Sequence, residues 1–177
     1  SAAVHNLAVL YHIMAMDLET GGAERTLTEV ELNNLNLFWR QSFRRWSALI
    51  NADSFWRRLE ERIRSYGDTR LRPEAVEDLR RGTTQMLLMI NARLAVAAAD
   101  RGDYATTQRH TRIMNDSGFE KSAILNVLTA AVDSLRDRLK TYVSNAKKES
   151  ETDPIHANRT AERLINLATP VLSAIDQ

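Results

Sequence analysis

The sequence contains no cysteine, and of its 177 residues only three are proline and six are glycine. The absence of cysteine excludes disulfides and every metal centre that depends on thiolate ligands. Scarce proline and glycine favour long helices over the many turns of a β-sandwich or barrel. No apolar run reaches the roughly 20 residues that a membrane-spanning helix needs. We therefore expect a cytoplasmic protein that does not enter a membrane.

The overall composition is that of an ordinary folded domain, with 44% hydrophobic and 27% charged residues. A net charge of +1 provides no overall attraction to nucleic acid or to a membrane surface. The basic residues are nevertheless mostly arginine, since the only lysines are Lys121, Lys140, Lys147 and Lys148. This bias has two explanations, a coding preference or selection for bidentate contacts with anions, and the sequence leaves both open.

Apolar residues recur at intervals of three and four in the first 70 positions, which predicts helices. The first helix should span 2–20 and end at the Gly21-Gly22 pair. The second should begin at Thr28, because Thr28 and Glu31 match a capping box. Asp53 should cap a third helix. The expected buried stripe of the second helix is Leu32, Leu35, Trp39, Phe43, Trp46 and Ile50.

The second half of the chain has the same periodicity. Pro73 suits the first position of a fourth helix, and Gly82 either divides it into 73–81 and 84–101 or leaves it whole. Asp103 should cap a helix of about twelve residues. Ser117-Gly118-Phe119-Glu120 matches another capping box, which would open a long helix over 118–149.

No stretch alternates apolar and polar residues for long enough to form a strand. We therefore predict an all-α fold with about seven helices, arranged as antiparallel helical hairpins. The helical domain should cover residues 1–149. The remaining segment, 150–177, should add a C-terminal helix after Asp153-Pro154 that packs on this domain, and Pro170 should kink or interrupt that helix.

The stretch 84–119 has the order helix, turn, helix, and small residues in its first half allow a second helix to approach closely. Its pattern resembles a tetratricopeptide repeat in Asn91-Ala92-Arg93-Leu94-Ala95, Ala98, Gly102-Asp103-Tyr104 and Thr107. Near the N-terminus, Asn6-Leu7-Ala8 and Tyr11 resemble another first helix of such a repeat. The resemblance covers about a third of the chain. The sequence departs from the family pattern where Thr107 replaces the usual alanine and where Phe119 replaces a common proline.

The resemblance implies a groove, lined by the first helices of the hairpins, that binds a protein or peptide partner. Asn6 and Arg93 would be its main polar anchors, since amide and guanidinium groups suit a peptide backbone or a carboxylate. The clamp of two lysines and two asparagines that binds chaperone C-termini is not reproduced. The groove-facing residues carried over from the family are His5, Asn6, Val9, Ala92, Arg93 and Val96.

No arrangement of residues indicates catalysis, a metal or a cofactor. His5 and His12 share a helical face but lie about 10 Å apart along it, too far for one zinc ion. The chain lacks an HExxH pattern, a glycine-rich phosphate loop and a GxSxG nucleophile motif. We therefore expect no enzyme and no cofactor.

Two other functions stay open beside the interaction module. The long 118–149 helix, or the last helix, could pair between copies and make a homo-oligomer. The arginine-rich segment 38–81 could bind nucleic acid, although Trp39, Phe43 and Trp46 fit a core stripe better than a base-stacking surface. The chain also begins without methionine inside an expected helix, which suggests a piece of a larger protein.

Overall fold

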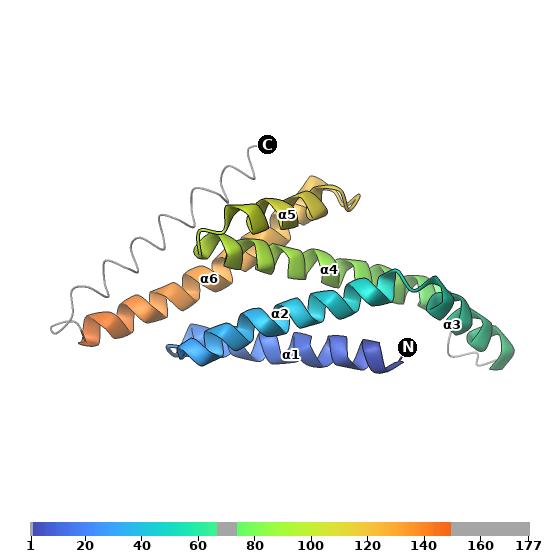
Figure 1. Cartoon of the computed structure of the whole chain (residues 1–177), viewed down its shortest axis with the longest axis horizontal. Helices are drawn as coiled ribbons and strands as arrows, with labels where there is room; N and C mark the ends of the chain where they lie inside the picture. The colour runs from blue at the N-terminus through green and yellow to red at the C-terminus, as the bar shows by residue number, and fades with distance from the viewer. Residues whose placement is uncertain (1, 67–73, 150–177) are drawn as a thin grey trace.

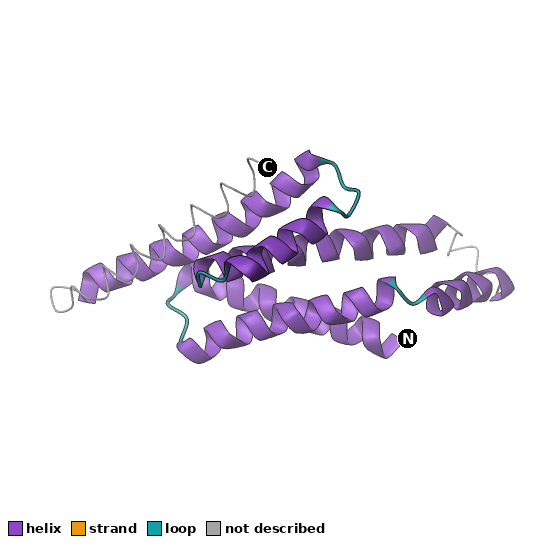
Figure 2. Ribbon diagram, turned by 45° about the horizontal axis from the view of Figure 1, so that its top comes forward, coloured by secondary structure: helices purple, strands orange, loops and turns teal. Residues whose placement is uncertain are grey.

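The computed structural model describes residues 2–66 and 74–149, and every element in these ranges is a helix (Figures 1 and 2). No strand occurs there, so the all-α prediction is confirmed. Pro73 and the expected final helix after Asp153 lie outside the described residues. The helices are α1 (Ala2–Glu24), α2 (Glu29–Ile50), α3 (Asp53–Tyr66), α4 (Glu74–Asp100), α5 (Tyr104–Asn115) and α6 (Lys121–Glu149).

None of the helices in the described part of the chain is both long and apolar enough to cross a membrane.

The central helix is α4, which contacts α2, α3, α5 and α6 and belongs to two core clusters. Ile90 and Leu94 join the cluster formed with α1 and α2. Ala92, Ala95 and Ala99 join the cluster formed with α5 and α6. These alanines are at most 2% exposed, and such small side chains let the neighbouring helices approach the α4 backbone closely. Gly82 does not divide α4, which is continuous from Glu74 to Asp100.

Hydrogen bonds place α5 beside the second half of α4. The Thr107 hydroxyl lies 3.4 Å from the Ala95 carbonyl oxygen, and His110 Nδ1 lies 2.8 Å from Asn91 Oδ1. Asp103 caps α5 as predicted, since its carboxylate accepts the Thr106 backbone N–H at 3.1 Å. The predicted length of α5 is also confirmed, at 12 residues.

The capping box at the start of α2 is confirmed. The Thr28 hydroxyl accepts the Glu31 backbone N–H at 3.2 Å, and the Glu31 carboxylate accepts the Thr28 backbone N–H at 2.8 Å. Arg25 also pairs with Glu31, and the Arg25 and Thr28 hydrogen bonds lower the pKa of Glu31 to about 2. The Glu31 carboxylate therefore caps the start of α2 and also binds Arg25, the residue that follows α1.

The predicted end of α1 is wrong, because this helix continues through Gly21 and Gly22 to Glu24. A Cβ at Gly22 would lie 3.1 Å from both Leu27 Cδ1 and Arg138 Cδ, so Gly22 allows close packing against α6. Gly22 is therefore a packing residue inside α1 and not the end of this helix.

Two further helix starts differ from the predictions. Ala52 occupies the capping position of α3, since its carbonyl accepts the N–H groups of Phe55 and Trp56, and Asp53 is the first helical residue. The Ser117 hydroxyl donates to the Met114 carbonyl oxygen at 2.5 Å, so it completes the end of α5 instead of capping the next helix. Consequently α6 begins at residue 121, later than the predicted 118.

The two adjacent glycines of α1 should respond differently to alanine. Nothing lies within 4 Å of a Cβ built at Gly21, so Gly21→Ala should stabilise the protein by about 0.5–1 kcal/mol through helix propensity alone. Gly22→Ala gains the same propensity but must displace Leu27 and Arg138, so its stability should not exceed that of the wild type. Urea denaturation measures both, and an equal gain at Gly22 would contradict the packing role.

Candidate partner-binding groove between α1 and α4

Two adjoining cavities lie between α1 and α4. One, of about 430 Å³, is bounded by α1, α2 and α4, and the other, of about 590 Å³, is bounded by α1, α3 and α4. Leu79 borders both cavities, so we treat them as one continuous α1–α4 groove. Its walls are largely apolar and include Val9, Trp46, Phe55, Leu59, Leu79 and Met86.

One face of α1 forms the first wall of the groove. His5, Val9 and His12 line it, and their spacing of four and three places them on a single helical stripe. From Ala2 to His12 this wall extends about 15 Å along the helix axis. That length corresponds to about three turns of a second helix laid beside it.

The floor of the α1–α4 groove holds two unpaired polar atoms. His12 Nδ1 and Trp46 Nε1 are both buried, and neither has a hydrogen-bond partner within the described residues. Burial, and then the nearby charge of Arg93, lowers the pKa of His12 below its usual value of 6.5. The His12 imidazole is therefore neutral at pH 7, and the floor is polar but uncharged there.

Gly82 lies in the opposite wall, in the interior of α4. A Cβ built at this position meets nothing within 4 Å, so the groove is open in front of it. Glycine costs helix stability relative to alanine, and nothing close to Gly82 requires the absence of a side chain. The α4 backbone at Gly82 is therefore accessible from the groove.

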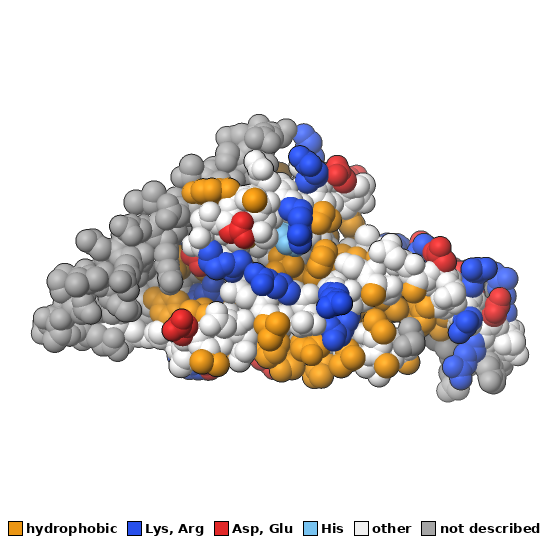
Figure 3. Space-filling view, viewed as in Figure 1, with side chains coloured by type: hydrophobic (Ala, Val, Ile, Leu, Met, Phe, Trp, Pro, Cys, Tyr) orange, Lys and Arg blue, Asp and Glu red, His pale blue; other side chains and the backbone are white. Residues whose placement is uncertain are grey.

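The outward face of α1 is apolar as well. Leu7, Leu10 and Ile13 are 40%, 50% and 51% exposed, and no Asp, Glu, Lys or Arg precedes Asp17 in the sequence. Figure 3 shows hydrophobic side chains gathered along the lower edge of the molecule, where α1 lies. Large exposed apolar patches commonly mark interaction surfaces, so α1 offers apolar area beyond the groove itself.

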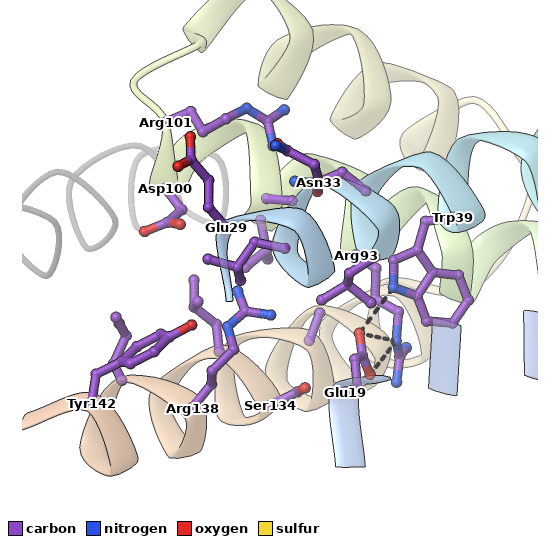
Figure 4. Close-up of a pocket in the computed structure, with 18 residues that line it drawn as sticks. Glu19, Glu29, Asn33, Trp39, Arg93, Asp100, Arg101, Ser134, Arg138 and Tyr142 are labelled. Atoms are coloured by element: carbon purple, nitrogen blue, oxygen red, sulfur yellow. Dashed lines mark hydrogen bonds and ion pairs between the residues drawn. The ribbon is translucent and has the colours of Figure 1, made fainter. Parts of the chain in front are cut away.

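A second, polar cleft of about 220 Å³ lies between α2, α4 and α6 (Figure 4). In it the Glu19 carboxylate accepts hydrogen bonds from Trp39 Nε1 at 3.1 Å and from Arg93 Nε at 3.0 Å. The Arg93 guanidinium also lies over the Trp39 ring, 5.1 Å from its centroid. The Arg93 and Glu19 side chains are only 10% and 11% exposed, so this ion pair connects α1, α2 and α4 from the inside.

The structure separates the six residues that the family resemblance selected. His5 and Val9 line the α1–α4 groove, and the exposed Asn6 lies beside them with its Oδ1 3.3 Å from His5 Nδ1. Arg93 and Val96 instead line the polar cleft.

Ala92 is fully buried in the core, with 0% exposure. The direct role of Ala92, Arg93 and Val96 in partner binding stays a prediction.

Three groove residues, Trp46, Leu79 and Gly82, were not predicted from the sequence. Of these, only Gly82, a glycine inside a helix, gave a sequence signal.

Within the described ranges, no group of three or more His, Asp or Glu side chains is placed to hold a metal ion. The perturbed histidines owe their pKa shifts to burial and to nearby arginines. The structure thus contains an apolar groove and a polar cleft.

Comparisons with family models, with curated proteins and with solved structures find no match for this chain.

Proposed function

We propose that this chain is a non-enzymatic protein–protein interaction module that binds a partner helix in the α1–α4 groove. The observation that carries the proposal is the groove itself, which is open, largely apolar and long enough for about three helical turns. Its apolar walls suit burial of the nonpolar face of an amphipathic helix, a recurrent mode of peptide recognition.

The helix pairs are consistent with a tetratricopeptide-like arrangement. The Ser42 hydroxyl donates to the Ala8 carbonyl oxygen at 3.1 Å, so α1 pairs with α2. The contacts of Thr107 and His110 similarly pair α4 with α5. In this proposal α1 and α4 are the first helices of two hairpins, and the groove lies between first helices as it does in that family.

A helix fits this groove better than an extended peptide. All the walls are helices, whose backbone N–H and C=O groups are already paired along each helix. An extended peptide would therefore find no strand edge with which to pair its own backbone. A helical partner satisfies its backbone internally and needs only side-chain contacts.

The two unpaired atoms on the floor favour one polar side chain on the partner. A buried donor or acceptor without a partner costs about 1–3 kcal/mol. Trp46 Nε1 can donate only, so an amide, hydroxyl or carbonyl oxygen that reaches it would remove this cost. A small outward shift of the ring is needed first, because the atom is fully buried in the free protein.

Selection from a displayed library of amphipathic helical peptides tests the proposal. We expect enriched helices with apolar residues at i, i+4 and i+7, because that spacing matches the α1 wall. Gly82→Leu should weaken their binding at least about tenfold, which corresponds to about 1.4 kcal/mol, because the new side chain fills the groove.

Gly21→Leu is the matched control, since Gly21 also lies inside a helix with open space at its Cβ but does not line the groove. This variant should bind the selected peptides within about twofold of the wild type. A library without enriched helices, or peptides that are equally sensitive to both leucines, would refute binding in the α1–α4 groove.

A further inference from the structure

Four exposed arginines form a second surface. They are Arg40 and Arg44 of α2, Arg101 in the turn directly after α4, and Arg109 of α5, and we call them the arginine patch. Lys and Arg side chains gather in the middle of the face drawn in Figure 3.

A ring contact between α2 and α5 positions this patch. The Phe43 and His110 rings meet edge to face, with centroids 5.7 Å apart. Arg109 precedes His110 directly, and the charges of Arg109 and Arg40 both act on the His110 ring, so these two guanidinium groups lie in one area. Arg40 lies one turn before Arg44 on α2.

The carboxylates of Asp100 and Asp103 act on the arginine patch through their charge. In the described part of the chain none of its four side chains makes an ion pair or a hydrogen bond, whereas other arginines do. Arg81 pairs with Asp78 at 2.5 Å, and Arg45 is hydrogen-bonded to Gln41 and stacked 4.7 Å from the Tyr11 ring centroid. The patch arginines are therefore free to bind an external anion.

The patch arginines disfavour further positive charge beside them. Burial, and then the charge of Arg40, lowers the pKa of Arg101. Burial, and then the charges of Arg109 and Arg40, lowers the pKa of His110. Asp103 and Asp100 oppose this effect at Arg101, and the pKa of Arg101 is still lowered overall, so their charges compensate the patch in part. An added anion would relieve the remaining repulsion.

We infer that the arginine patch binds an acidic protein segment through its Asp or Glu carboxylates. Guanidinium groups hold carboxylates with two parallel hydrogen bonds, which lysine cannot do. Asp100 and Asp103 lie close enough to act on Arg101, and they would repel the evenly spaced phosphates of a nucleic acid. The carboxylates of an acidic segment sit on separate flexible side chains, which can turn away from Asp100 and Asp103, whereas the phosphates are fixed along the nucleic-acid backbone. This inference does not depend on the proposed groove function.

Fluorescence anisotropy with a labelled octaglutamate peptide tests this inference, with a thymidine octanucleotide as the competing polyanion. We expect octaglutamate to bind more tightly than the octanucleotide. Arg40→Glu/Arg109→Glu should weaken octaglutamate binding at least about tenfold, because two attractive charges become repulsive. Arg57→Glu/Arg80→Glu, which makes the same charge change at exposed positions outside the patch, should change binding less than about threefold.

Equal losses in the two double variants would show general charge attraction and would overturn the assignment. Tighter binding of the octanucleotide, or no octaglutamate binding at low salt, would overturn it as well. Circular dichroism checks that each variant is folded. If the charge reversal unfolds the protein, Arg40→Gln/Arg109→Gln removes both charges without adding new ones and should still weaken octaglutamate binding.

Discussion

Replacing Glu19 with alanine is expected to lower the free energy of unfolding by about 3–5 kcal/mol, because the change leaves a buried arginine without its counter-charge. Arg93 is only 10% exposed, and among the described residues the Glu19 carboxylate is its one ion-pair contact. The substitution also removes the acceptor of the Trp39 Nε1–H. Urea denaturation at neutral pH measures the loss, with an unchanged m-value as the sign that the change is in native-state stability.

Two controls separate burial from charge. Asp78→Ala breaks the Arg81–Asp78 pair, whose side chains are 62% and 66% exposed, and should cost no more than about 1 kcal/mol. Glu19→Ala combined with Arg93→Met should recover much of the loss, since no buried charge then remains unpaired. A Glu19→Ala loss no larger than that of Asp78→Ala would contradict the internal role that we assign to this pair.

Acid should lower the free energy of unfolding, because His110 is harder to protonate in the folded protein than in the unfolded chain. Burial, and then the charges of Arg109 and Arg40, lowers the pKa of His110 to about 4. In the unfolded chain the pKa is about 6.5, so the unfolded state binds more protons between these two values. The contribution of neutral His110 to the free energy of unfolding is therefore fully present above pH 6.5. It is lost as the pH falls towards 4, by up to about 3 kcal/mol.

His110→Gln isolates this contribution, because glutamine stays neutral throughout the range. The groups that face His110 are the Phe43 ring, the Asn91 side chain, Arg109 and Arg40. Unfolding free energies at pH 7 and pH 4.5 should differ clearly less in His110→Gln than in the wild type. Equal pH dependence in both proteins would show that His110 is not the responsible group.

Local patterns predicted the parts of the fold that depend on neighbours in sequence. Thr28 with Glu31, and Asp103 with Thr106, act within one helical turn, so their capping roles could be predicted from spacing alone. The alanines of residues 92–99 likewise indicated a helix that a second helix can approach closely, and these alanines are buried. These features depend only on which residues lie three or four positions apart.

The helix boundaries that the sequence did not predict depend on contacts outside the local pattern. Helix α1 continues through Gly22, where the missing side chain leaves room for Arg138 of α6, a neighbour that no local pattern reveals. Ser117 matched a capping box, but its hydroxyl is used by the Met114 carbonyl at the end of the preceding helix. The helix boundaries therefore depend on tertiary packing and on competition between two adjacent helix ends.

The candidate site was predicted in part. His5 and Val9 share the predicted face of α1 and line the groove. Arg93 was predicted as a free anchor, but the carboxylate that pairs with it, Glu19, is 74 residues away in sequence. The opposite wall, around Leu79 and Gly82, belongs to a part of α4 that the repeat pattern does not cover.

Photo-cross-linking from position 82 tests the central claim most directly. A benzophenone-bearing residue at this position lies in the α1–α4 groove, and the same residue at position 21 lies in open space outside it. We expect a selected helical peptide to cross-link from position 82 and not from position 21. Cross-linking from position 21 alone, or equal yields from both positions, would contradict the groove as the site where a partner helix binds.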